Sequence, residues 1–100
     1  MELRPRQQEL CESSAWDFTG LRAVFLNCTL KPSSDRSHTQ GLIDVSRTIM
    51  ERVGVEVETI RPVDHEIAPG VQPDMTEHGF ARDDWPEILE RVMAANIVVL

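Results

Sequence analysis

Hydrophobic and polar residues follow three different patterns along the chain, and each pattern predicts a different element. From Leu21 to Cys28 the apolar residues are consecutive, as is typical of a strand covered on both faces. From His38 to Val53 they recur at the spacing of one helical face, and Gly54 stands where a left-handed C-terminal cap is preferred. Between Val55 and Ile60 smaller apolar residues alternate with glutamate, which predicts a strand nearer the edge of a sheet.

A second helix and a third strand are predicted after a long connection. Residues 62–83 contain several prolines and glycines and show no helical or strand period. Pro86 stands where a first helical turn tolerates proline, an apolar stripe follows it, and Ile97 to Leu100 begin another buried strand. The element order β-α-β-α-β predicts an α/β fold, a doubly wound parallel sheet with strand order 2-1-3.

The chain divides into two parts by its pattern. Residues 1–20 are polar and without period, so we expect an N-terminal extension that is flexible, or one that Trp16 and Phe18 anchor on the domain or on a partner chain. Residues 21–100 are interpreted as the N-terminal half of a larger α/β domain. The reason is that the last strand reaches Leu100 with nothing after it to cover its apolar surface.

Charge and cysteine content limit the classes of partner and the cellular compartment that we expect. Seventeen acidic and ten basic residues give a formal charge of -7, the wrong sign for binding nucleic acid or an anionic membrane surface. No apolar run approaches the roughly 20 residues of a membrane-spanning helix. Cys11 and Cys28 belong to no CxxC or Cys/His cluster, and no secretory signal precedes the first strand. We therefore expect a cytoplasmic protein without a disulfide.

The loop between the first strand and the first helix is the main candidate for chemistry. In doubly wound sheets this loop faces the ligand crevice at the carboxyl ends of the strands. Residues 29–39 hold five hydroxyl side chains and the cations Lys31 and Arg36, which suits an anion such as a phosphate monoester at a helix start. The loop matches neither GxGxxG nor the P-loop of nucleotide triphosphatases. The alternative is that Ser37 or Thr39 only caps the helix.

A family resemblance extends this interpretation. The stretch FLNCTLKPSSDRSHT, the segment VEVETIRPVDHEIAPGVQPDM, DDWPEI and the ANIVVL strand resemble the NAD(P)H-dependent FMN reductase branch of the flavodoxin superfamily over about residues 22–100. In that family the loop has the form G-S-x-R-x-x-S-N-T and binds the FMN phosphate. The resemblance places five residues at cofactor-binding positions: Thr29, Lys31, Ser37, His38 and Thr39.

The resemblance implies a flavodoxin-like fold, FMN as cofactor and NAD(P)H as electron donor. It also implies a loop around the flavin ring after the third strand, which would lie past Leu100. Asn27 and Cys28 stand where glycine is usual in the family, and His38 stands for asparagine. The catalytic residues are not identified by this comparison.

Other polar residues allow rival interpretations. The acidic residues and histidines of 64–78 suggest a metal site, but their spacings match no zinc pattern, and a solvated loop is favoured. Trp85, before Pro86, is interpreted as a boundary residue that packs on the core. The leading hypothesis is an FMN-binding oxidoreductase. The alternative is a non-catalytic module that pairs its open sheet edge with another chain, including a second copy of itself.

Overall fold

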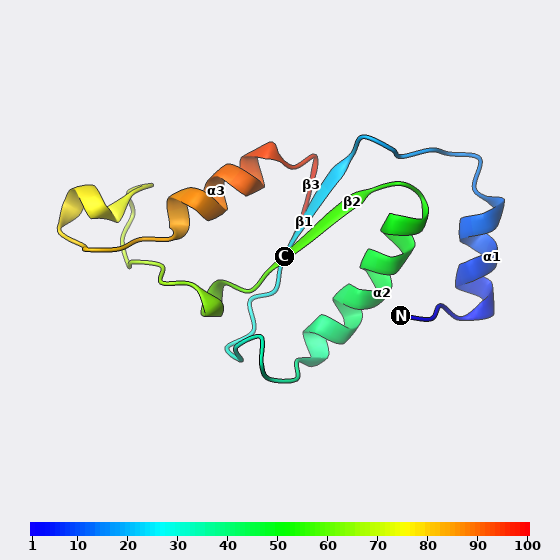
Figure 1. Cartoon of the computed structure of the whole chain (residues 1–100), viewed down its shortest axis with the longest axis horizontal. Coiled ribbons are helices and arrows are strands. Elements are labelled where there is room, and N and C mark those ends of the chain that lie inside the picture. Colours follow the sequence, from blue (N-terminus) through cyan, green and yellow to red (C-terminus); the bar gives the residue numbers. More distant parts are fainter.

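The computed structural model describes all of residues 1–100 and contains a three-stranded sheet with helices on both faces (Figure 1). Eight elements follow one another along the chain. They are α1 (Pro5–Ser13), β1 (Arg22–Leu26), α2 (His38–Arg52), β2 (Glu56–Ile60), the 3-10 helices η1 (Pro62–Asp64) and η2 (Met75–His78), α3 (Trp85–Ala94) and β3 (Ile97–Val99).

The sheet is parallel, with β1 in the centre between β2 and β3. Successive side chains of β1 point to opposite faces, so Phe25 packs with Ile43 of α2, and Val24 packs with Ile88 of α3. Both faces are therefore covered, which explains the continuous apolar run. The predicted α/β fold with flavodoxin-like strand order 2-1-3 is confirmed.

The end of α2 has the predicted cap. Gly54 has a φ of 100°, a left-handed conformation that side chains with a Cβ rarely adopt. A Cβ at this position would also lie 2.9 Å from the backbone nitrogen of Thr19. The chain therefore turns directly from α2 into β2, and the N-terminal segment packs closely over this turn.

The third strand differs from its prediction. Sequence pattern favoured burial on both faces, but β3 is only partly buried, and Val98 is 45% exposed. The reason is its place at the edge of the sheet, where only β1 lies beside it. Leu42 of α2, predicted on the apolar face of its helix, is also 74% exposed. Apolar surface thus remains open on this side of the sheet.

The N-terminal residues contain a helix that the polar pattern did not predict. Pro5 occupies its first turn, and the Arg4 N–H donates to the Gln7 side chain at 2.9 Å. Leu3 is buried, and the Phe18 N–H donates to the Val53 carbonyl at 3.0 Å. The segment thus contacts the domain through backbone and Leu3, while Trp16 is 76% exposed.

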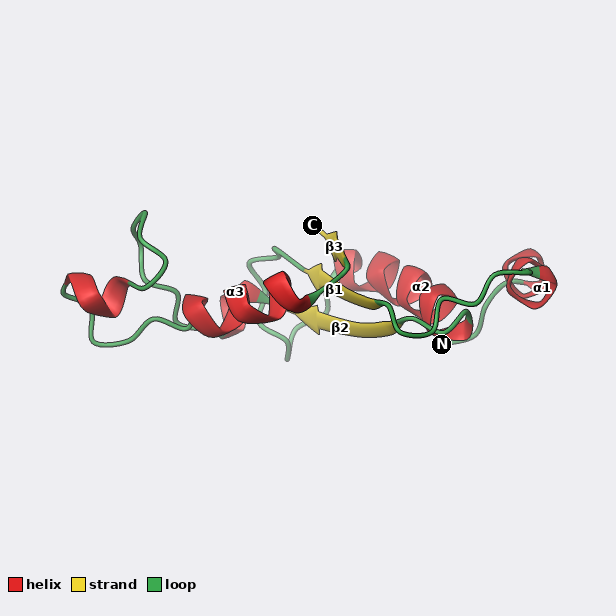
Figure 2. Ribbon diagram, turned by 90° about the horizontal axis from the view of Figure 1, so that it is seen from above, coloured by secondary structure: helices red, strands yellow, loops and turns green.

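The molecule is long and thin, with extents of 53 × 29 × 16 Å. Seen from above, η2 lies at one end of the long axis and α1 at the other, with the sheet between them (Figure 2). The connection predicted to lack helical period contains η1 and η2, each a single short turn. We call residues 65–84 the arm. No helix of the chain is long and apolar enough to cross a membrane.

Candidate functional site

The loop between β1 and α2, residues 27–37, lies at the carboxyl edge of the sheet. Because β2 and β3 lie on opposite sides of β1, the strand order reverses beside this loop. That reversal is where ligands bind in open α/β sheets. The fold therefore puts the β1–α2 loop at the position expected of a ligand site.

Asn27 closes the base of the loop. Its side chain is fully buried directly after β1, where its Nδ2 donates to Gln40 Oε1 at 3.1 Å and to Ser37 Oγ at 3.4 Å. Its Oδ1 accepts the N–H of Thr29 at 3.2 Å. One amide thus ties the start of the loop to the first turn of α2, and every polar group of this buried side chain has a partner.

The start of α2 presents free donors. Ser37 is the N-cap, and its Oγ accepts the N–H of Gln40 at 3.1 Å. The backbone N–H groups of Arg36, Ser37, His38 and Thr39 donate to no other group of the chain. Free N–H groups and the positive end of a helix dipole together favour an anion. The capping role of Ser37, the simpler alternative, is present and is compatible with that use.

The five residues named by the resemblance all lie on this loop or helix start. Ser37 is 8% exposed, and its hydroxyl is engaged in the cap. The Thr29 hydroxyl accepts the Lys31 N–H at 3.2 Å. The side chains of Lys31, His38 and Thr39 are exposed. The last three are accessible to a ligand, whereas Ser37 and Thr29 mainly shape the loop.

Two residues that follow β2 hold the loop in place. Arg61 was not singled out from the sequence, and Asp64 was considered there only as part of a possible metal site. Arg61 is 8% exposed, and its Nη1 donates to the carbonyls of Lys31, Pro32 and Asp35 at 3.3, 2.8 and 3.1 Å. Asp64 of η1 accepts the Ser33 N–H at 2.8 Å and the Ser33 hydroxyl. The available signal was a lone arginine continuing the apolar strand pattern after Ile60.

Asp64 is ionised while it holds the loop. The Ser33 hydroxyl, then the Ser33 N–H and more weakly the charge of Arg61, hold the pKa of Asp64 below its ordinary value of 3.8. The loop itself carries two cations, Lys31 and Arg36, and one acidic residue, Asp35. Within this loop the cations thus outnumber the acidic residues by one, in a chain whose overall charge is -7.

An apolar hollow of about 210 Å³ lies beside Thr39 at the same edge of the sheet. The hollow lies between the N-terminal half of α2 and the end of β3. The lining residues are Phe25, Leu26, Thr39, Leu42, Ile43, Ser46, Val99 and Leu100. Polar donors at the start of α2 therefore border directly on apolar surface, as in sites that bind an amphipathic ligand.

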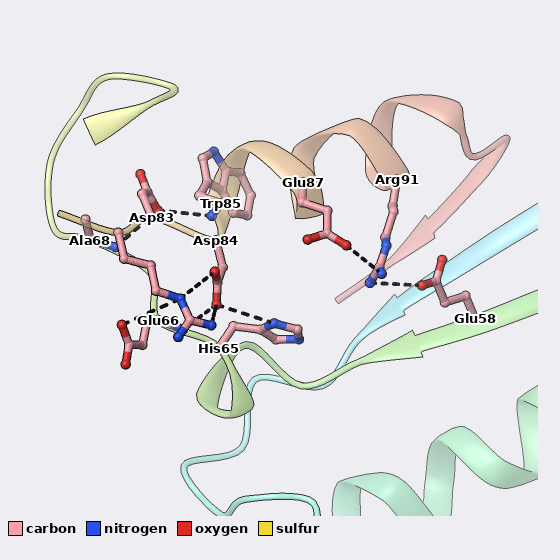
Figure 3. A network of polar contacts seen from close by, with 10 residues as sticks. Glu58, His65, Glu66, Ala68, Asp83, Asp84, Trp85, Glu87 and Arg91 are labelled. Atoms are coloured by element: carbon pink, nitrogen blue, oxygen red, sulfur yellow. Dashed lines mark hydrogen bonds and ion pairs between the residues drawn. The ribbon is translucent and has the colours of Figure 1, made fainter. Parts of the chain in front are cut away.

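The polar residues of the arm serve a different purpose. Asp83 accepts the N–H groups of Ala68 and Trp85 at 3.2 and 3.0 Å (Figure 3). It also accepts the N–H of Met75 at 3.1 Å. Asp84 accepts the Glu66 N–H at 2.8 Å. These carboxylates hold both ends of the arm together. The chain has no group of three or more His, Cys, Asp or Glu side chains able to hold a metal ion.

These bonds lower the pKa values of Asp83 and Asp84. The Met75 N–H and then the Trp85 N–H lower the pKa of Asp83 below 3.8. The Arg82 side chain and then the Glu66 N–H do the same for the pKa of Asp84. Trp85 begins α3 and packs against the cluster around Ile88, so its predicted place as a boundary residue on the core is confirmed.

Two curated proteins are similar to most of this chain. One is 8-demethyl-8-aminoriboflavin-5'-phosphate synthase of Streptomyces davaonensis, 39% identical over 85 residues, which cover 80% of this chain and 33% of the synthase. The other is the divalent metal cation transporter MntH of Mycobacterium bovis, 59% identical over 83 residues, covering 83% of this chain and 12% of the transporter. This chain therefore spans a third or less of either protein.

A solved structure agrees with the first of these. The crystal structure of RosB with bound intermediate 8-demethyl-8-formylriboflavin-5'-phosphate has a TM-score of 0.69 and 38% identity, over 79% of this chain and 33% of RosB. No family model matches the chain. The comparisons thus connect the α/β fold with flavin-related enzymes, and they support the flavin part of the predicted resemblance without specifying a reductase.

Proposed function

We propose that this chain binds the 5'-phosphate end of a flavin and belongs to a flavin-associated enzyme. The observation that carries the proposal is the set of four free N–H groups from Arg36 to Thr39, at the strand-order reversal of the sheet. The intermediate bound to RosB, which has a similar fold, is by its name a riboflavin 5'-phosphate derivative. FMN is the simplest ligand of that chemistry.

The residues fit an FMN phosphate. The N–H groups of Ser37, His38 and Thr39 would donate to phosphate oxygens, as would the Thr39 hydroxyl. Lys31, near the start of the loop, would add a positive charge on a flexible side chain. The Thr29 hydroxyl accepts the Lys31 N–H and so holds this part of the loop in place. The apolar hollow beside Thr39 gives the less polar part of the ligand a surface to lie against.

Bound FMN supplies hydride and electron transfer chemistry. The family resemblance favours its use as a redox cofactor with NAD(P)H as donor. The name of the synthase describes a flavin 5'-phosphate as the molecule that is made, which favours a second use, chemical change of the flavin itself. Consumption of NAD(P)H with FMN recovered intact supports the first use, and conversion of FMN to a new flavin supports the second.

Titration of the purified chain with FMN tests the binding proposal. We expect quenching of FMN fluorescence at micromolar concentrations, with competition by inorganic phosphate. Riboflavin, which lacks the phosphate, is the matched control and is expected to bind at least about tenfold more weakly, since several charge-assisted hydrogen bonds are lost. Equal affinity for the two flavins, or no quenching by either, would refute the phosphate site.

The open side of the sheet favours a second candidate, a module that pairs with another chain. β3 has no partner on its outer edge, and Val98, Leu42 and Leu100 are 45%, 74% and 89% exposed. Apolar surface of this kind is typical of interfaces. Sedimentation equilibrium is expected to show a dimer that Val98→Lys dissociates. A monomer at all concentrations would count against pairing with a second copy.

A further inference from the structure

Arg61 is a buried cation whose partners all belong to the β1–α2 loop. It follows Ile60 at the end of β2 and is 8% exposed. A buried charge is costly unless hydrogen bonds satisfy it. Here those bonds go to three carbonyl oxygens that lie 26 to 30 residues earlier in the chain. Arg61 and the loop therefore stabilise each other in a single arrangement.

The position of Arg61 fixes the direction of a donor at the proposed site. The chain has no cis peptide bonds, and in a trans peptide the C=O and N–H point in opposite directions. Because the Asp35 carbonyl points to Arg61 at 3.1 Å, the N–H of Arg36 in the same peptide group points away from it. That N–H is the first of the four free donors before and within the start of α2.

A second peptide group is held from both ends. The Pro32 carbonyl accepts from Arg61 at 2.8 Å, while the Ser33 N–H of the same peptide donates to Asp64 at 2.8 Å. Arg61 and Asp64 are three residues apart, at the junction of β2 and η1. This junction therefore acts as a rigid support for a loop that has no regular secondary structure of its own.

We propose that Arg61 is the positioning residue of the phosphate site. It orients the β1–α2 loop so that the donors from Arg36 onward point at one anion before the ligand arrives. Donors that are already oriented pay no ordering cost on binding, which raises affinity. Because Arg61 is 8% exposed and its Nη1 donates to three loop carbonyls, its role in this proposal is exerted through the loop. This inference rests on the proposed function.

Two substitutions test the proposal. Arg61→Gln removes the charge and most donors, and Arg61→Lys keeps the charge but loses the planar fork. Arg91→Gln is the matched control, since Arg91 of α3 is also partly buried but bonds to Glu58 and Glu87 instead of the loop. Each protein is titrated with FMN and with riboflavin, and circular dichroism checks that it is folded.

We expect Arg61→Gln to weaken FMN binding about ten- to hundredfold, the scale of lost charged hydrogen bonds, and riboflavin binding by less than about twofold. Arg61→Lys should be intermediate, and Arg91→Gln unchanged. Hydrogen exchange of the ligand-free proteins supplies an independent readout. Amides of residues 33–39 should exchange faster in both Arg61 variants, while those in the middle of α2 should not change.

Other outcomes decide against the proposal in distinguishable ways. If the unmodified chain binds FMN and the Arg61 variants bind it equally well, Arg61 has no positioning role. Equal losses for FMN and riboflavin would show that Arg61 only maintains the fold. Failure of the unmodified chain to bind either FMN or phosphate overturns the proposed function as well. If the Arg61 variants do not fold, Asp64→Asn replaces them in the test, because Asp64 is exposed and bonds to Ser33 of the same loop. The proposal then requires Asp64→Asn to lower the affinity for FMN. An unchanged affinity overturns it.

Discussion

The β1–α2 loop and the arm are both irregular segments rich in polar residues, but they are held in opposite ways. The β1–α2 loop is tied to α2 by its own first residue, Asn27, and is held from outside by Arg61 and Asp64 from a segment beyond β2. The arm is held from inside, by Asp83 and Asp84 near its own C-terminal end. The loop is thus coupled to the sheet, whereas the arm is an independent structural unit.

This difference indicates where function and adaptability lie. A segment whose shape depends on the sheet can keep donors in fixed positions, which ligand binding requires. A segment that depends only on its own hydrogen bonds can change without disturbing the core, because its opening costs less than global unfolding. Among the residues of 64–78 that suggested a metal site, Asp64 holds Ser33 of the β1–α2 loop, and Asp74 accepts the Thr76 N–H at the start of η2.

The largest effect is expected from Asn27→Ala, which breaks the attachment of the loop to the sheet. It leaves the Thr29 N–H and the Gln40 side chain, both partly buried, without their partner and removes a fully buried side chain, so the free energy of unfolding should fall by about 2 to 3 kcal/mol. Urea denaturation measures this. Asn96→Ala, an exposed asparagine that accepts the Arg22 N–H at 2.9 Å, should cost about 0.5 to 1 kcal/mol. Equal losses of unfolding free energy in the two variants would contradict a special role for Asn27.

Acid should open the arm before it releases the β1–α2 loop. The folded pKa values of Asp83 and Asp84 lie below 3.8. Their stabilising contribution is therefore complete above that value and is lost as pH falls through the lowered folded pKa. The loop loses the Asp64 contribution in the same range but keeps the hydrogen bonds of the Asn27 amide and of Arg61.

Trp85 reports this opening, because its N–H donates to Asp83. In a Trp16→Phe background Trp85 is the only tryptophan, and its emission should shift on acidification before circular dichroism changes. Asp83→Asn should produce part of the shift at neutral pH, whereas Asp74→Asn, which affects only the cap of η2, should not. Emission that changes only together with circular dichroism would show that arm and core unfold as one unit.

The smallest effect is expected from Lys31→Gln. The side chain is exposed, so stability should change by less than about 0.5 kcal/mol. FMN affinity should fall roughly two- to fivefold, as for one partly solvated charge near a phosphate, and about 1 M salt should remove the difference. Arg6→Gln in α1 makes the same change of charge at the other end of the domain and should leave FMN affinity unaltered. If Lys31→Gln binds FMN with unaltered affinity, this lysine is not part of the site.

The sheet and its two covering helices were predictable because burial on one or both faces leaves a period in the sequence. The run through β1, the stripe of α2 and Gly54 are direct consequences of that burial. The position of the candidate loop followed from topology. Helix α1 was not predicted, since it is polar and is fastened by Leu3 and by contacts of adjacent residues that carry no period.

The supports of the candidate site were also beyond prediction. Asn27 and Arg61 are single polar residues at strand ends, and their partners lie far away in sequence. Hydrogen bonds of this kind depend on the register between β1 and β2, which a single sequence does not reveal. The overestimated burial of β3 has a related cause, because apolar composition indicates what a strand is able to bury and not what lies beside it.

The dependence of the loop on Arg61 and Asp64 also sets an order of events in folding. Contacts that join residues 26 to 31 positions apart form only after the intervening chain has been closed, at a cost in entropy. Arg61 reaches the loop only when β2 has paired with β1. The Arg36 N–H is therefore oriented late, as a product of strand pairing, and this orientation depends on β2 staying paired with β1.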